Sequence, residues 1–174
     1  MSDETTQKSA PSAAETPALP EPGYFGRYLQ QKGVEIEPLG PDATGNEMVR
    51  IGREQLLRAG ELLRDWPESP MDFMVCVTGI DWKTHRESVY LLESTISHKR
   101  LLIKVLADAN DHSPSLYPVW PAVDWHERET FDLMGIRYDG HPDLRRILMP
   151  TYWDGYPLRK GYKEEDPRLV WNRR

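Results

Sequence analysis

Residues 127–148 read ERETFDLMGIRYDGHPDLRRIL, and the interpretation of the whole chain depends on this stretch. Its first part predicts the end of a helix over residues 121–134, because no helix breaker interrupts that segment. Gly135 stands where a helix needs a left-handed C-terminal residue. Beyond it the pattern changes to short extended pieces and a turn at Asp139-Gly140. The stretch therefore predicts a helix that ends in a sharp reversal of the chain.

The charged side chains of this stretch are placed to form ion pairs. Arg128 and Asp132 stand four residues apart on the expected helix, a spacing that favours an ion pair between them. Arg145 and Arg146 adjoin, and in an extended chain their side chains point to opposite sides. We therefore expect one of the two arginines to pair with Glu129 or Asp132 and the other to face a partner protein.

The same stretch offers the groups that general acid–base catalysis uses. They are His126, Glu127, Glu129, Asp132 and His141. His126-Glu127 begins like the helix of a zinc protease, but that motif needs a second histidine where Thr130 stands. Carboxylates so near to arginines are more often ion-pair partners than titrating acids. An independent enzyme stays an alternative, which a deep pocket uniting these groups would support.

The stretch resembles, nearly letter for letter, the signature of the thirty-kilodalton subunit family of respiratory complex I, the proton-pumping NADH–quinone oxidoreductase. A second block, residues 153–162, resembles the family pattern W-x-G-x-P-L-R-K-x-Y. Two positions depart from the family, with Tyr156 where a histidine is common and Gly161 where an aspartate is common. The resemblance marks sixteen structural or interface residues: Glu127, Arg128, Glu129, Asp132, Gly135, Gly140, His141, Pro142, Leu144, Arg145, Arg146, Trp153, Pro157, Leu158, Arg159 and Lys160.

The resemblance implies a cofactor-free, non-catalytic subunit in the peripheral arm of complex I, beside the hydrogenase-like large subunit and the iron–sulfur subunits. FMN and the iron–sulfur clusters would then lie in partner subunits, which carry electrons from NADH to quinone while the complex pumps protons. The implied place is the cytoplasmic face of the cell membrane, or the matrix or stromal equivalent in an organelle. An equivalent subunit of a related complex fed by ferredoxin or another donor is the alternative, because nothing in this sequence identifies the donor.

Composition agrees with a protein that contains no cofactor of its own. The single cysteine, Cys76, excludes an internal disulfide and a cysteine-ligated cluster within this chain, and its apolar surroundings predict a buried residue. No glycine-rich nucleotide-binding motif is present. No apolar run approaches the ~18 residues that span a bilayer, so we expect a soluble protein that reaches the membrane only through partners.

The first 135 residues predict an α+β domain with a mixed or antiparallel sheet and helices on one face. One helix should carry Tyr24, Tyr28 and Leu29 and end at Gly33, and a second should cover residues 54–66. Strands are expected over residues 34–37, 47–51, 73–79, 88–97 and 100–107, with a tight turn at His98-Lys99. His85, His98 and His112 are expected at the surface, and residues 108–114 as a loop with an Asx turn.

The chain divides into a disordered leader (1–22), a core domain (23–135) and an extended C-terminal arm (136–174). The arm has nine Lys and Arg against six Asp and Glu in a chain of net charge −6, with six Tyr and Trp and four prolines. Such a segment suits a partner-binding arm, because Arg, Tyr and Trp concentrate binding energy at interfaces. Folding back over its own sheet is the alternative. Nucleic-acid binding is disfavoured by the acidic total.

Overall fold

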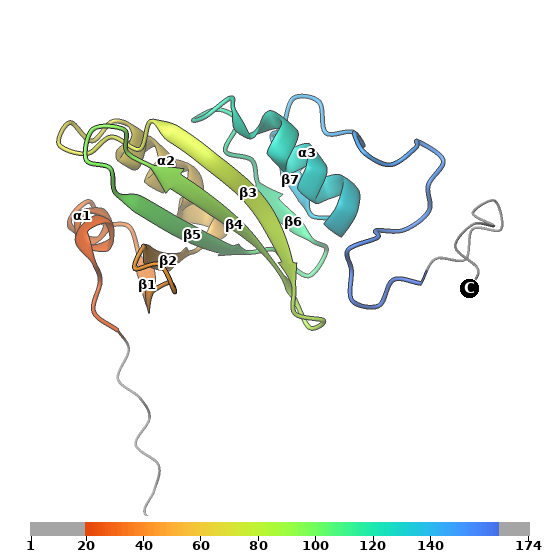
Figure 1. The fold of residues 1–174 in the computed structure, drawn as a ribbon, viewed down its shortest axis with the longest axis horizontal. Helices are drawn as coiled ribbons and strands as arrows, with labels where there is room; N and C mark the ends of the chain where they lie inside the picture. The colour runs from red at the N-terminus through yellow and green to blue at the C-terminus, as the bar shows by residue number, and fades with distance from the viewer. Residues whose placement is uncertain (1–19, 164–174) are drawn as a thin grey trace, which may run out of the picture.

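The computed structural model describes residues 20–163, drawn in Figure 1 as a twisted sheet with helix α2 behind it and helix α3 at one end. The helices are α1 (Tyr24–Gln31), α2 (Leu56–Arg64), which follows a single 3-10 turn at Arg53–Gln55, and α3 (Val123–Met134). The strands are β1 (Ile36–Pro41), β2 (Glu47–Ile51), β3 (Phe73–Asp81), β4 (Arg86–Glu93), β5 (Arg100–Leu106), β6 (His112–Pro114) and β7 (Arg137–Asp139).

The main sheet has five strands in the order β1-β2-β5-β4-β3. Strands β3, β4 and β5 form an antiparallel meander, and β1 and β2 form an antiparallel hairpin, as the strand spacing predicted. Strand β2 then joins β5 in parallel, with Val49 opposite Ile103. A second, two-stranded parallel sheet pairs β6 with β7. The fold class is therefore α+β with a mixed sheet, which confirms the prediction.

All three helices contribute to a single hydrophobic core against one side of this sheet. The alternation of strand residues decides which side is covered, because successive side chains point to opposite faces. In β5, Leu101 and Ile103 are fully buried, whereas Leu102 between them is only partly buried. The fully buried helix residues in the core are Leu29, Leu56, Ala59, Leu63 and Val123. The amphipathic pattern that predicted α2 is thus explained by its contact with the core.

Two local predictions are wrong. Cys76 is partly buried rather than buried, because a bulge between Met74 and Cys76 shifts the register and places Cys76 opposite Leu91. Strand β4 ends at Glu93, so the connection to β5 is longer than a tight turn at His98-Lys99. The hydroxyl of Ser94 accepts the Ser97 N–H at 3.2 Å, which draws this segment into a turn.

The predicted leader lies almost wholly outside the described residues. Within residues 20–163, no helix is long and apolar enough to cross a membrane. The expected Asx turn is confirmed, since Asp108 Oδ1 accepts the N–H groups of Asn110 at 2.8 Å and His112 at 2.9 Å. The expected loop is nevertheless shorter than predicted, because residues 112–114 pair with β7 as strand β6.

Candidate functional site

Helix α3 ends as the sequence predicted. Gly135 adopts φ +76°, in the left-handed region, and its N–H donates to the Phe131 carbonyl at 2.9 Å. Because of this turn the chain reverses into β7, and the arm then runs beside α3 and past its C-terminal end (Figure 1). The motif residues on α3 and those on the arm therefore lie on neighbouring elements.

Asp132 is the main attachment point between α3 and the arm. Its side chain is fully buried, and its Oδ1 accepts a hydrogen bond from Arg146 Nη1 at 2.7 Å. Its Oδ2 accepts the backbone N–H groups of Ile147, Leu148 and Met149 at 3.0, 2.7 and 2.8 Å. Burial alone would raise the pKa of Asp132, but these hydrogen bonds outweigh burial and lower it. One carboxylate thus fixes four consecutive residues of the arm.

The two adjacent arginines are separated as predicted. Arg146 pairs with Asp132 and also donates from Nη2 to the Gly155 carbonyl at 2.9 Å. The side chain of Arg145 is 70% exposed, and among residues 20–163 it pairs only with the exposed Asp143, at 2.7 Å. Arg146 therefore stabilises the fold of this chain, whereas the guanidinium of Arg145 stays at the surface.

The predicted ion pair between Arg128 and Asp132 does not form. Arg128 Nη1 lies 3.9 Å from Asp124 Oδ1, one turn earlier on α3, and its Nε donates to the Arg145 carbonyl at 3.3 Å. His141 contacts the same Asp124 oxygen through Nε2 at 3.3 Å. The prediction failed because the arm supplies Asp132 with better donors than a neighbour on the same helix.

Glu127 faces the opposite way from Asp132, into the interior. It is fully buried, and it accepts hydrogen bonds from the Ser115 hydroxyl at 2.6 Å and the Leu116 N–H at 2.9 Å. Burial raises the pKa of Glu127 to about 7, although both hydrogen bonds lower it. The charge of Asp124 adds to the increase. Glu127 therefore ties α3 to the segment that follows β6.

A second group of contacts holds the end of the described arm. Arg159 Nε donates to the Met134 carbonyl at 2.7 Å, and its Nη2 pairs with Asp111 at 3.0 Å. The same guanidinium lies 4.3 Å from the centre of the Tyr156 ring. The Lys160 N–H donates to Asp81 Oδ2 at 2.8 Å. The described part of the arm is therefore held by α3, Asp111 and the β3–β4 hairpin, whereas residues 164–174 lie outside the described part.

The remaining motif residues have simpler roles. Gly140 adopts φ +85° in the turn after β7. Leu144 packs against the core, and Trp153 and Pro157 are half-buried. Glu129, Pro142, Leu158 and Lys160 are exposed. Sequence reasoning did not single out Asp81, Asp111 or Ser115, because their partners lie far along the chain and no local spacing marks them.

The acid–base groups do not come together as a catalytic set. Glu127 and Asp132 are buried with separate partners, and Glu129 is exposed. Within residues 20–163, no group of three or more His, Cys, Asp or Glu is placed to hold a metal ion.

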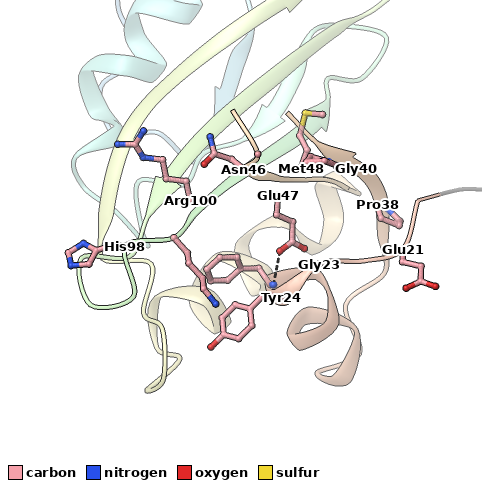
Figure 2. Close-up of a pocket in the computed structure, with 14 residues that line it drawn as sticks. Glu21, Gly23, Tyr24, Pro38, Gly40, Asn46, Glu47, Met48, His98 and Arg100 are labelled. Carbon is pink, nitrogen blue, oxygen red and sulfur yellow. Dashed lines mark hydrogen bonds between the residues drawn. The ribbon is translucent and has the colours of Figure 1, made fainter. Parts of the chain in front are cut away.

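A cavity of about 490 Å³ lies at the other end of the molecule, between α1, the β1–β2 hairpin and the turn before β5 (Figure 2). One of its two carboxylates, Glu47, accepts the N–H groups of Phe25 and Gly26 at the start of α1, at 2.8 and 2.7 Å.

Replacing Gly135 with alanine is expected to lower the free energy of unfolding by about 2 kcal/mol. A side chain at positive φ costs about 1–2 kcal/mol, and the added Cβ would also lie 2.7 Å from the Tyr156 ring and against Arg159 Nη2. Gly140→Ala is the matched control, because it has the same backbone strain and no atom within 4 Å of its Cβ. Urea denaturation should show a larger loss for Gly135→Ala, and equal losses would contradict a contact with the arm.

The α+β fold has a solved counterpart. A chain in the structure of the membrane-bound sulfane sulfur reductase, an archaeal respiratory membrane complex, aligns with a TM-score of 0.58. The alignment covers 79% of this chain and 82% of that one, at 20% sequence identity. At this identity, the likeness concerns the fold alone.

Sequence comparison identifies the family. Residues 49–168 match the family described as the 30 kDa subunit of respiratory-chain NADH dehydrogenase, and the chain belongs to that family. A Mycobacterium ulcerans protein, named as the C subunit of NADH-quinone oxidoreductase, is 44% identical over 142 residues, which cover 77% of this chain and 60% of the relative. A Klebsiella pneumoniae protein, named as the C/D subunit of NADH-quinone oxidoreductase, is 35% identical over 173 residues, which cover 93% of this chain and 28% of the relative. The resemblance predicted from residues 127–162 is thus confirmed.

Proposed function

We propose that this chain is a cofactor-free structural subunit in the peripheral arm of a proton-pumping NADH–quinone oxidoreductase. The observation that carries the proposal is the role of the family motif, whose charged residues hold the arm on the core rather than forming a catalytic set. Asp132 with Arg146 is the main example. Electron transfer from NADH through FMN and iron–sulfur clusters to quinone would then belong to partner subunits.

The partner that we propose is the hydrogenase-like large subunit. Support comes from the relatives whose names join C and D, in which the part that matches this chain takes up only 28–29% of the length. A single chain that joins two subunits keeps them together, so separate chains of the same family need a stable contact instead. Iron–sulfur subunits are the further partners, and the chain would associate with the membrane only through the complex, on its cytoplasmic side.

The surface available for this contact lies on α3 and the arm. Large side chains are exposed there: Trp125, Leu148, Tyr152 and Leu158, at 72%, 58%, 64% and 59%. Arg145 adds an exposed guanidinium. Aromatic residues and arginine are the types that dominate binding energy at protein interfaces. We therefore assign docking to this end of the molecule.

Arg145→Ala tests this assignment. The change is expected to leave the stability of the isolated chain within about 0.5 kcal/mol, because its only ion pair is exposed. The amount of assembled complex in membranes should fall about threefold or more, since truncation of an arginine at an interface often costs above 1 kcal/mol. Quinone reductase activity per assembled complex should not change. Arg27→Ala, an exposed arginine on α1, is the control.

Normal assembly with lost turnover would overturn the structural role and return residues 127–148 to the list of candidate active sites. Isolation of the native complex from solubilised membranes, with its subunits identified, tests the proposed partners directly. Absence of this chain from an NADH-oxidising complex would contradict the proposal.

A further inference from the structure

A pocket of about 620 Å³ lies between the β3–β4 hairpin and the last described turn of the arm. The hairpin contributes Asp81, Lys83 and Arg86, and the arm contributes residues 155–156 and 159–162. In Figure 1 the arm passes beside the tip of this hairpin. The pocket therefore exists only because two segments about 70–80 positions apart in the sequence meet there.

The walls of this pocket are held by buried carboxylates. Asp81 is 6% exposed, and it accepts the N–H groups of Lys83 and Lys160, both at 2.8 Å, so one side chain joins the hairpin to the arm. Asp111 also joins the hairpin to the arm, because its carboxylate pairs with the guanidinium groups of Arg86 and Arg159. The backbone positions of both lysines are thus fixed by the fold.

Positive charge exceeds negative charge at this site. Four cations, Lys83, Arg86, Arg159 and Lys160, stand against the carboxylates of Asp81 and Asp111. Both carboxylates are already engaged by the walls. Among residues 20–163, the ammonium groups of the two lysines have no carboxylate at ion-pair distance, and Lys160 Nζ lies 5.6 Å from the centre of the Trp82 ring. Two cations on fixed backbone positions are therefore available to an anionic ligand.

We propose that this pocket binds an acidic segment of a partner subunit, with two carboxylate side chains placed against Lys83 and Lys160. Tyr156 and Tyr162 line the same pocket and Trp82 is exposed beside it, so aromatic surface and positive charge occur together. That combination suits a peptide, which presents carboxylates and apolar atoms side by side. The assignment rests on the proposed function, since it names the chemistry of one contact within the assembly.

A phosphate or nucleic-acid ligand fits the surroundings less well. Both guanidinium groups pair with Asp111, and that of Arg159 also donates to the Met134 carbonyl, so neither presents its whole planar donor fork to a phosphate. The chain has a net charge of −6, which opposes a long nucleic acid. Lysine ammonium groups, which act as point charges, suit scattered carboxylates.

The first test titrates the isolated full-length chain with a capped hexaglutamate peptide and follows backbone amide signals by NMR. We expect shifts at Lys83, Lys160 and Gly161 and an affinity that falls with added salt. Lys83→Gln with Lys160→Gln should weaken binding about tenfold or more. Lys32→Gln with Lys99→Gln removes the same charge from the α1 end and should change the affinity less than twofold.

Each other outcome overturns the proposal in a distinguishable way. If both double variants weaken hexaglutamate binding equally, the peptide is held by general electrostatic attraction rather than by a specific site. Comparable binding of inorganic phosphate would reassign the pocket to phosphoryl groups. A further outcome is that hexaglutamate binds strongly only after Glu164, Glu165 and Asp166 are changed to amides. That result would mean that these acidic residues of the same chain compete with the peptide for the pocket.

The second test uses the assembled complex. The double variant Lys83→Gln with Lys160→Gln is expected to dissociate from the solubilised complex at lower salt than the parent chain, while the Lys32 and Lys99 variant behaves like the parent. Unchanged salt resistance would overturn the proposed acidic contact and leave the proposed function intact. Absence of the parent chain from any complex would defeat the proposed function itself.

Discussion

Replacing Asp132 with alanine is expected to lower the free energy of unfolding by about 3–5 kcal/mol, because the change leaves Arg146 and three backbone N–H groups without their acceptor. Natural domains have about 5–15 kcal/mol of stability in total. The loss is therefore a large part of what holds the chain folded. The arm should be affected first, since residues 146–149 are the ones that Asp132 binds.

Urea denaturation of the isolated chain measures this loss. Asp143→Ala is the matched control, because the ion pair of Asp143 with Arg145 joins two side chains that are more than half exposed. It should change the free energy of unfolding by no more than about 0.5 kcal/mol. Hydrogen exchange gives an independent check, since the amides of Ile147, Leu148 and Met149 should be protected in the parent and exposed in the variant. A loss below about 1 kcal/mol for Asp132→Ala would refute its role as the attachment point.

The sequence alone predicted much of this arrangement. The end of α3 at Gly135 follows from local rules, because a left-handed residue is a backbone requirement that glycine meets. The divergent arginines could be predicted for a similar reason, since adjacent side chains in an extended segment point apart. The sequence thus makes Arg145 or Arg146 a possible partner of Asp132, and the structure places Arg146 at 2.7 Å from it.

Other parts of the site could not be predicted, because their partners are far apart in sequence. Lys160 bonds to Asp81 across 79 positions, and Arg159 bonds to Asp111 across 48. Helical spacing suggested a pair between Arg128 and Asp132, but spacing says nothing about which other donors compete for a carboxylate. Backbone N–H groups of the arm donate to Asp132 in place of Arg128. The parallel pairing of β2 with β5 also depends on tertiary packing rather than on local pattern.

Glu127 illustrates the difference between a buried acid and a catalytic one. Its carboxyl group has a pKa near physiological pH, a property often associated with active sites. The geometry gives it a different role, because the side chain is fully buried and both oxygens accept hydrogen bonds from Ser115 and Leu116. The unusual pKa therefore makes the stability of the fold depend on pH.

Glu127→Gln is expected to remove a pH-dependent loss of stability. Folding raises the pKa of Glu127 from its usual 4.5 to about 7. The contribution of the Glu127 carboxyl group to the free energy of unfolding is therefore fully present below pH 4.5 and is lost as the pH rises through 7. Well above pH 7, the free energy of unfolding is therefore about 3 kcal/mol lower than below pH 4.5, because a shift of one pKa unit corresponds to about 1.4 kcal/mol.

Glutamine cannot ionise, keeps a carbonyl oxygen for the Leu116 N–H, and can donate its amide to the Ser115 hydroxyl. The Glu127→Gln chain should therefore match the parent within about 1 kcal/mol at pH 5 and exceed its stability by about 2–3 kcal/mol at pH 8.5. Urea denaturation at a series of pH values measures this, with the exposed Glu129→Gln on the same helix as the control. Parallel stability curves for parent and Glu127→Gln would show that Glu127 does not titrate in this range, and that the fold tolerates its charge.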